Sequence, residues 1–288
     1  RDVAPSRGLG DVYKRQINIS EAVIDIYKTP YDEGVDRDRV QIFKGRKLLS
    51  QKASDTLAVK LLGGPNLSVY VDVVKNPDVL LFDCGDISQG TPYYNLFRGE
   101  VEVRMMNLMG YDAMTIGNHE FDFGLDNMAR LFRMAHFPVV CANYDVTGTV
   151  LEGLVKPYVV LERGGMKIGV FGVSPKMEGL VQADKCEGIV YNDPIVAAQE
   201  VTDLLRTKEG CDVVICLSHL GFRLKNEVCD EKLAAATRGI DVILGGHSHT
   251  FMEKPAFCLN AEGKSIPVLH TGRSGIFVGE LDLTLTKE

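Results

Sequence analysis

The chain has 288 residues and a formal charge of −7 at neutral pH, because 39 acidic side chains outnumber 32 basic ones. Its hydrophobic content of 45% and charged content of 25% are ordinary for a globular protein, and its length suits one large domain or two small ones. An acidic balance without a Lys/Arg-rich block argues against a nucleic-acid partner. No apolar run approaches the roughly 20 residues of a membrane-spanning helix, so no membrane span is expected.

The first 75 residues differ in character from the rest. Residues 1–16 show no amphipathic period and resemble an assembly remnant, and the first 30 residues contain no apolar stretch of the kind found in secretory signals. Residues 17–75 contain only short apolar runs. We therefore expect residues 1–75 to be an atypical leader, artefactual or truncated, and residues 76–288 to form the folded domain.

From residue 76 onward, strand and helix patterns alternate. Apolar runs and period-two patterns predict strands over 78–83, 113–116, 138–142, 158–161, 167–173, 213–217, 241–244 and 275–286. Helical spacing predicts helices over 94–109 and 124–135, one opened by Asp193-Pro194, and one over 230–237. The two strands around Gly164-Gly165 are expected to form a hairpin. This order predicts an α/β fold in which a mixed sheet is layered with helices.

The seven cysteines do not suggest a disulfide framework. Their number is odd, no C-x-x-C pair occurs, and Cys141 and Cys216 lie inside apolar runs. Cysteine in such a run behaves as a small hydrophobic side chain. Neither a zinc finger nor a disulfide-stapled fold is therefore expected.

Potential metal ligands follow four of the predicted strands. Asp86 follows the first, Asn118 the second, His219 comes after strand 213–217, and His247 and His249 come after strand 241–244. Loops at such strand ends are where α/β folds gather their functional sites. Carboxylate, amide oxygen and imidazole ligands without cysteine suit a hydrolytic site with two divalent metal ions, among which Mn, Zn, Fe, Co and Mg remain open.

Five segments carry a resemblance to a known family: FDCGDISQGTPYYNLFRGE, YDAMTIGNHEFDFG, VVCANYD, ICLSHLG and ILGGHSHTF. They resemble the catalytic domain of 5'-nucleotidases and 2',3'-cyclic phosphodiesterases, within the calcineurin-like metallophosphoesterases. The ligand-bearing motifs occur in the family's order across residues 76–288, which is more specific than any one motif. The resemblance implies a four-layer α-β-β-α sandwich with mixed sheets. It also implies metal-dependent hydrolysis of phosphate esters, above all nucleoside 5'-monophosphates, and favours a periplasmic or exported protein.

The resemblance also assigns the metal ligands. Asp86 would bridge both ions, Asn118, His219 and His247 would complete the ligands of one ion, and His249 would bind the other. A purely structural interpretation of Asn118 is that of a turn residue.

Two further residues would act on the phosphate. The resemblance places His119 beside it as an electrostatic stabiliser or proton donor, oriented by Asp122. Asp122 could instead cap the helix that begins at Gly124. His136, at the end of a predicted helix, is expected to be structural. His270 is a candidate to contact and orient the metal ligands without binding the metal itself.

The chain departs from the family at the family's first motif. That motif is an Asp-x-His on the first strand, but this sequence contains no Asp-x-His, and no histidine precedes His119. One ion would then have only Asp86 and His249 from the protein. Asp25 is the one upstream aspartate that ends a strand-like run, and so the one candidate to substitute for the missing motif. The alternative function is therefore a non-catalytic or impaired phosphatase-like subunit. Its partner would be a separate substrate-binding chain, because relatives bind the base through a C-terminal domain that residues 76–288 lack.

Overall fold

A computed structural model describes residues 39–44, 47–53, 57–60, 68–71, 79–90, 92–281 and 283. Asp25 lies outside these residues. They fall in two compact units, of which the first includes the residues up to Val79. In it, β1 (Arg39–Lys44) pairs with β2 (Lys47–Ala53), and β3 (Leu57–Lys60) pairs with β4 (Ser68–Val71), both antiparallel. The second unit spans Leu80–Asn107 and Tyr111–Gly279, so it holds every other predicted site residue.

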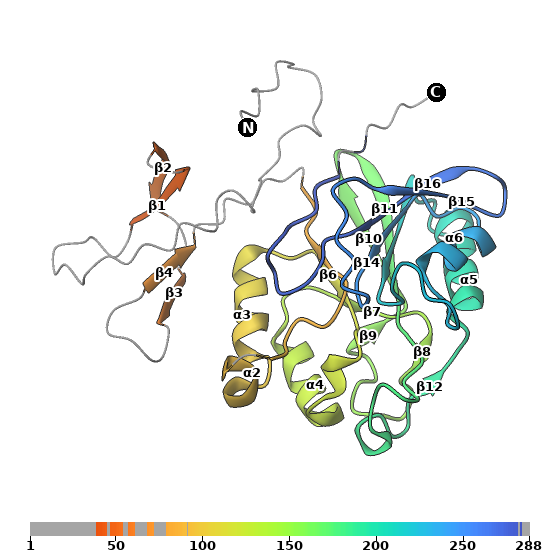
Figure 1. The fold of residues 1–288 in the computed structure, drawn as a ribbon, viewed down its shortest axis with the longest axis horizontal. Helices are drawn as coiled ribbons and strands as arrows, with labels where there is room; N and C mark the ends of the chain where they lie inside the picture. Colours follow the sequence, from red (N-terminus) through yellow and green to blue (C-terminus); the bar gives the residue numbers. More distant parts are fainter. Residues whose placement is uncertain are drawn as a thin grey trace. The chain divides into compact units, whose positions relative to one another are not determined.

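Two sheets form the centre of the second unit (Figure 1). The smaller is all parallel, in the order β5 (Phe82–Asp83), β6 (Ala113–Thr115), β7 (Val139–Val140), β9 (Val155–Lys156). The larger is mixed, in the order β10 (Tyr158–Arg163), β11 (Met166–Val173), β13 (Val213–Ser218), β14 (Val242–Gly245), β16 (Ser265–His270), β15 (Ala256–Leu259). Its inner strands are parallel, and its two edge strands are antiparallel. A short pair, β8 (Tyr144–Asp145) with β12 (Val190–Tyr191), lies outside both sheets.

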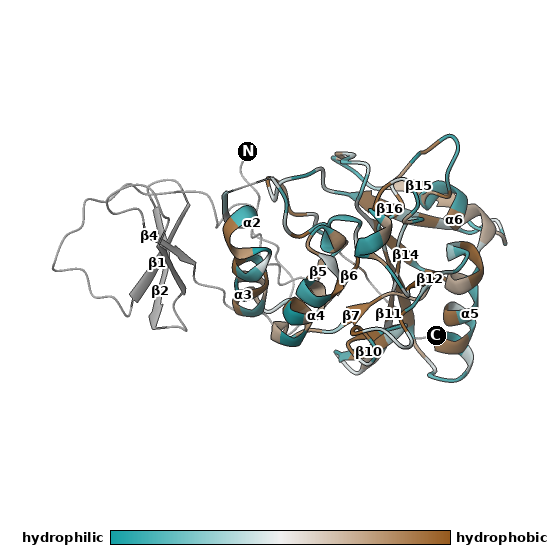
Figure 2. Cartoon of the chain, turned by 90° about the horizontal axis from the view of Figure 1, so that it is seen from below, coloured by the Kyte–Doolittle hydropathy of each residue, from teal (hydrophilic) through white to brown (hydrophobic). Residues whose placement is uncertain are grey.

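Helices cover the outer face of each sheet, which confirms the predicted four layers (Figure 1). Helices α3 (Glu100–Met109) and α4 (Gly124–Met134) share one buried cluster with the smaller sheet, and α2 (Pro92–Phe97) precedes them. Helices α5 (Pro194–Thr207) and α6 (Asp230–Ala236) share a second cluster with the larger sheet. In Figure 2, α4 and α5 show both hydrophobic and hydrophilic colours, as expected of helices with one buried face. None of the helices in the described parts of the chain is long and apolar enough to cross a membrane.

Close packing between the two sheets depends on Gly172 of β11. A Cβ atom at this position would overlap the Thr115 side chain of β6 and the carbonyl oxygen of Val140 in β7. The main chain connects the layers directly, because the amide of Ala142 donates to the Gly172 carbonyl at 2.7 Å. A glycine is therefore needed here because the two sheets leave no room for a side chain, and not because the chain turns.

Gly172→Ala is accordingly expected to lower the free energy of unfolding by about 1–3 kcal/mol, the range typical of overpacked cores. The clash includes a backbone oxygen, which cannot rotate away as a side chain can. Urea unfolding followed by circular dichroism measures the effect. An unchanged midpoint would contradict the close approach of the sheets at this residue.

Two predicted elements are wrong. The helix expected over 94–109 is interrupted between α2 and α3, where Arg98 and Gly99 have φ of 52° and 93°. A left-handed turn at glycine is a common helix terminator. The strand expected over 275–286 is also missing from the described part of that range, 275–281 and 283. Ser274 and Gly275 turn the chain there with positive φ. An alternating apolar pattern alone does not specify a neighbouring strand with which this segment could pair.

Candidate metal centre and active site

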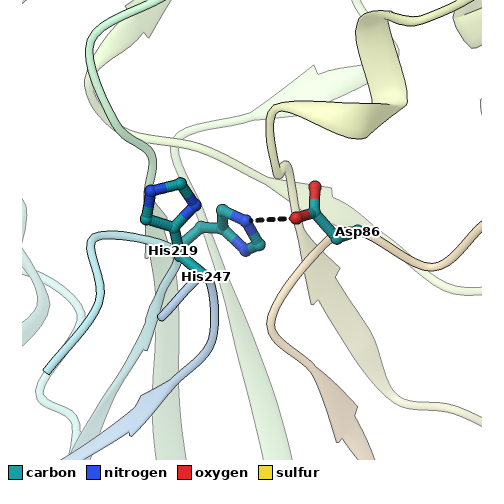
Figure 3. A group of neighbouring side chains, drawn as sticks. All are labelled: Asp86, His219 and His247. Carbon is teal, nitrogen blue, oxygen red and sulfur yellow. Dashed lines mark hydrogen bonds and ion pairs between the residues drawn. The ribbon is translucent and has the colours of Figure 1, made fainter. Parts of the chain in front are cut away.

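Three of the predicted ligands lie together at the strand ends. Asp86 follows β5 of the smaller sheet, while His219 and His247 follow β13 and β14 of the larger sheet. One ligand atom from each lies within 4.8 Å of those from the other two. The Nε2 atom of His219 is 2.9 Å from Oδ2 of Asp86, and the two imidazole rings are 5.0 Å apart (Figure 3). The site therefore joins the ends of the two sheets.

The backbone at the site is strained. Among the described residues, five non-glycine residues have positive φ, and three of them are predicted ligands: Asp86 (62°), His247 (68°) and His249 (52°). This region is costly for residues other than glycine, although Asp and His tolerate it better than most. Strain concentrated at one place is typical of functional sites, where the surroundings hold side chains in a required direction.

Gly117 makes room for the carboxylate of Asp86. A Cβ atom on Gly117 would overlap both the Asp86 carboxylate and its backbone amide. The loops after β5 and β6 can therefore approach each other only with glycine here. This explains in spatial terms why a glycine immediately precedes Asn118 in the GNHE motif.

His219 is held in one tautomer. Its ring is buried, and Nδ1 lies 2.5 Å from the carbonyl oxygen of Cys84, so Nδ1 donates its proton there. Nε2 is then the nitrogen that could bind a metal, with its other nitrogen fixed by a backbone acceptor as in many metal sites. Burial lowers the pKa of His219, but the hydrogen bond and charge of Asp86 outweigh burial and raise it. Conversely, burial raises the pKa of Asp86, but its contacts with His219 lower it overall.

Asn118 supplies the clearest sign that a ligand fits here. Its side chain is buried, and its Oδ1 atom has no hydrogen-bond partner. An unpaired buried acceptor costs about 1–3 kcal/mol, and a divalent cation is one ligand that would satisfy it. Asn118 also occupies the N-cap of the short 3-10 helix η1 (His119–Phe121) without a capping hydrogen bond from its side chain, so its assignment as a ligand stays a prediction.

The donor set fits a divalent transition metal. It combines a carboxylate, an amide oxygen and imidazole nitrogens, which suit Mn, Zn, Fe or Co. Burial and the nearby charge of His219 lower the pKa of His247, which favours the neutral, ligating form of that ring. His249 is exposed and is not part of the three-residue group, so its assignment to a second ion stays a prediction.

His119 and Asp122 form the predicted pair. Nδ1 of His119 lies 2.9 Å from Oδ2 of Asp122, and both side chains are partly exposed. The backbone amide of His119 also donates to Oδ1 of Asp86 at 2.8 Å, which connects the pair to the ligand group. Asp122 is not the N-cap of α4, since Phe123 occupies that position. The orienting role therefore fits the geometry better than the capping alternative.

Glu120 is a site residue to which the sequence pattern assigned no role. Its buried carboxylate accepts the backbone amides of Asp86 and Ile87 at 2.9 Å each and that of Gly117 at 2.5 Å. Burial raises its pKa to about 7, and the charge of Asp86 adds to this. Glu120 thus ties together the loops after β5 and β6. The one feature of the sequence that points to Glu120 as a site residue is its position directly after His119.

The other two histidines lie outside the ligand group. His270 is buried, and its Nε2 atom is 2.5 Å from Oδ2 of the buried Asp230. The second oxygen of Asp230 bonds to Ser218, the residue before His219. His270 thus supports the end of β13 indirectly. His136 is exposed at the end of α4, as its expected structural position implies.

Asp83, at the end of β5, gives a pH-dependent prediction. Burial raises the pKa of its carboxyl group to about 6, although the amide of Gly85 donates to it at 2.8 Å. Between about pH 4 and pH 6 the folded protein keeps a proton that the unfolded chain has released. Binding of this proton stabilises the folded state relative to the unfolded chain. The stabilisation is lost as the pH rises through that window, by at most about 1.4 kcal/mol per pH unit.

Comparing wild type with Asp83→Asn isolates this effect. The stability of the wild type relative to the variant should fall from pH 4 to pH 6, measured by chemical denaturation with a chelator present. A constant difference across that range would show that Asp83 titrates normally.

Comparison with known proteins identifies the family. The family model of calcineurin-like phosphoesterases matches residues 58–251 and so begins upstream of residue 76. The 5'-nucleotidase of Rattus norvegicus is 34% identical over 224 residues, which cover 72% of this chain and 38% of that protein.

Two solved structures are also similar. A 5'-nucleotidase precursor from Thermus thermophilus has 35% identity and a TM-score of 0.62, covering 66% of this chain and 39% of that one. The NAD nucleotidase of Haemophilus influenzae has 28% identity and a TM-score of 0.59, covering 66% and 40%. The chain thus spans about two fifths of the length of these relatives. Because the family model matches about two thirds of the residues of this chain, the chain belongs to the calcineurin-like phosphoesterase family.

Proposed function

We propose that this chain hydrolyses phosphate esters, with nucleoside 5'-monophosphates as its main substrates. The observation that carries the proposal is the convergence of Asp86, His219 and His247 at one point. The His119–Asp122 pair is connected to this group through the backbone amide of His119, which donates to Asp86, and the unpaired amide oxygen of Asn118 belongs to the residue before His119. The proposed nucleotide substrate is supported by the similarity to 5'-nucleotidases.

Asp86, Asn118, His219 and His247 would hold divalent metal, with Asp86 shared between two ions and His249 on the second. Bound divalent ions supply positive charge for the phosphate oxygens and lower the pKa of water. The protein fixes the ligands for this purpose: Cys84 orients His219, and Glu120 holds the amides around Asp86.

His119 would act on the substrate itself. Because Nδ1 faces Asp122, Nε2 is the nitrogen left for the phosphate or the leaving oxygen. His119 would thus stabilise negative charge on the phosphate or give a proton to the departing oxygen, while Asp122 keeps the ring in place.

Phosphate release from the purified chain tests the proposal. The expected result is turnover of nucleoside 5'-monophosphates with added Mn²⁺, loss of turnover with a chelator, and recovery when Mn²⁺ is restored. Nucleoside 3'-monophosphates serve as the matched substrate control. Metal binding without any phosphate release would contradict the proposal and favour the alternative suggested by the missing Asp-x-His, a non-catalytic subunit with a separate partner chain.

A further inference from the structure

Tyr94 contacts the His119–Asp122 pair from a separate segment of the chain. It lies on α2, and its hydroxyl donates to Oδ2 of Asp122 at 2.5 Å. This is the same carboxylate oxygen that faces Nδ1 of His119 at 2.9 Å. One oxygen of Asp122 thus accepts hydrogen bonds from both the Tyr94 hydroxyl and the His119 ring. Nothing in the spacing of the sequence predicts this contact, because 28 residues separate Tyr94 from Asp122.

The phenol ring of Tyr94 is fixed by packing. It lies against the ring of Phe123, with centroids 4.9 Å apart, and the guanidinium of Arg98 covers Phe123 at 5.2 Å. The end of α2 is tied to α4, since the side-chain amide of Asn127 donates to the Arg98 carbonyl at 3.0 Å. The packing of the Tyr94 ring therefore holds its hydroxyl in position to contact Asp122.

The hydroxyl acts as a donor at any working pH. Burial, together with the hydrogen bond and charge of Asp122, raises the pKa of Tyr94 above its ordinary value. The phenol thus stays protonated and remains a hydrogen-bond donor to Asp122. A partly exposed carboxylate without this partner would be free to turn toward water.

We propose that Tyr94 is a positioning residue of the phosphoesterase site, which fixes the Asp122 carboxylate and through it the ring of His119. This inference rests on the proposed function for its kinetic consequence, but the hydrogen-bonded arrangement itself does not. Tyr94 touches no reacting atom in this arrangement. Its removal should therefore lower kcat and leave KM nearly unchanged.

The variant Tyr94→Phe tests the proposal, because it keeps the ring on Phe123 and removes only the hydroxyl. We expect kcat for a nucleoside 5'-monophosphate to fall about tenfold, as for the loss of one hydrogen bond to a charged group. With 4-nitrophenyl phosphate, whose leaving group needs no proton, the loss should be smaller. Tyr158→Phe is the matched control, since Tyr158 makes the same type of bond to Glu209, at 3.0 Å, away from the site.

A double-mutant cycle separates positioning from general damage. In an Asp122→Ala background, Tyr94→Phe should cause no further loss, because the oxygen that the hydroxyl orients is gone. An equal loss in both backgrounds would overturn the proposal. So would equal kcat for Tyr94→Phe and wild type.

A measurement without turnover keeps this inference distinct from the proposed function. In nitrogen-edited proton NMR, we expect the Nδ1–H of His119 to give a slowly exchanging signal in wild type and Tyr158→Phe. That signal should exchange faster in Tyr94→Phe. If wild type hydrolyses no phosphate ester, the proposed function fails, but this signal still decides the role of Tyr94. An unchanged signal in Tyr94→Phe would refute it.

Discussion

Replacing His119 by alanine is expected to lower kcat for phosphate release by about 10²–10⁴-fold, the range typical of a lost general acid or base. Metal content should stay at the wild-type level. The reason is that the His119 ring is directed to Asp122, while only its backbone amide contacts the ligand Asp86, and alanine keeps that amide. Kinetics and elemental analysis of the same preparations provide the two measurements.

His136→Ala is the matched control for this experiment. His136 is exposed and lies at the end of α4, so its removal should change neither turnover nor metal content. If His119→Ala instead lost its metal together with its activity, His119 would be a ligand, and its proposed role beside the phosphate would be wrong.

Asp86→Asn is expected to have the largest effect of all, namely loss of bound metal and of detectable turnover. The substitution preserves the shape of the side chain, and asparagine tolerates the positive φ of 62° at this position. It removes the negative charge that would be shared between two ions and that pairs with His219. Metal content by mass spectrometry and phosphate release by colorimetry measure the two losses.

Asp184→Asn controls for the change of one carboxylate to an amide, because Asp184 is exposed in the short helix η2 (Ala183–Lys185). This variant should keep wild-type metal and turnover. Full metal content and normal turnover in Asp86→Asn would contradict the assignment of Asp86 as a ligand.

Local signals in the sequence predicted much of the fold. Asp193 caps α5 as expected, since its carboxylate accepts the amides of Ile195 and Val196. The hairpin around Gly164-Gly165 is present as β10 and β11. These features are determined by neighbouring residues, and a cap or a tight turn has the same physical cause in any fold.

Features that depend on distant residues could not be predicted. Strand β16 contains Pro267, which weakens any strand pattern, yet it pairs with β14 and β15 within the larger sheet. The break between α2 and α3 occurs where Gly99 fits against the side chain of Leu131 in α4. Both depend on tertiary partners that no local window contains.

The candidate site shows the same division. Asp86, His219 and His247 could be chosen from the sequence because each follows a predicted strand, and strand ends of α/β sheets converge. The structure brings these three together. The supporting contacts of Glu120 and Tyr94 could not be inferred, because each depends on how two loops or helices are placed in space. The assignment of His249 to a second ion stays a prediction, and Asp25 lies outside the described residues.

A crystal grown with Mn²⁺ and measured at an X-ray energy where manganese scatters anomalously gives the sharpest test of the proposed metal centre. We expect an anomalous peak bounded by Asp86, Asn118, His219 and His247, and a second peak that shares Asp86 and lies beside His249. A manganese peak elsewhere in the chain, with none beside Asp86, would contradict the metal centre and the hydrolytic function built on it.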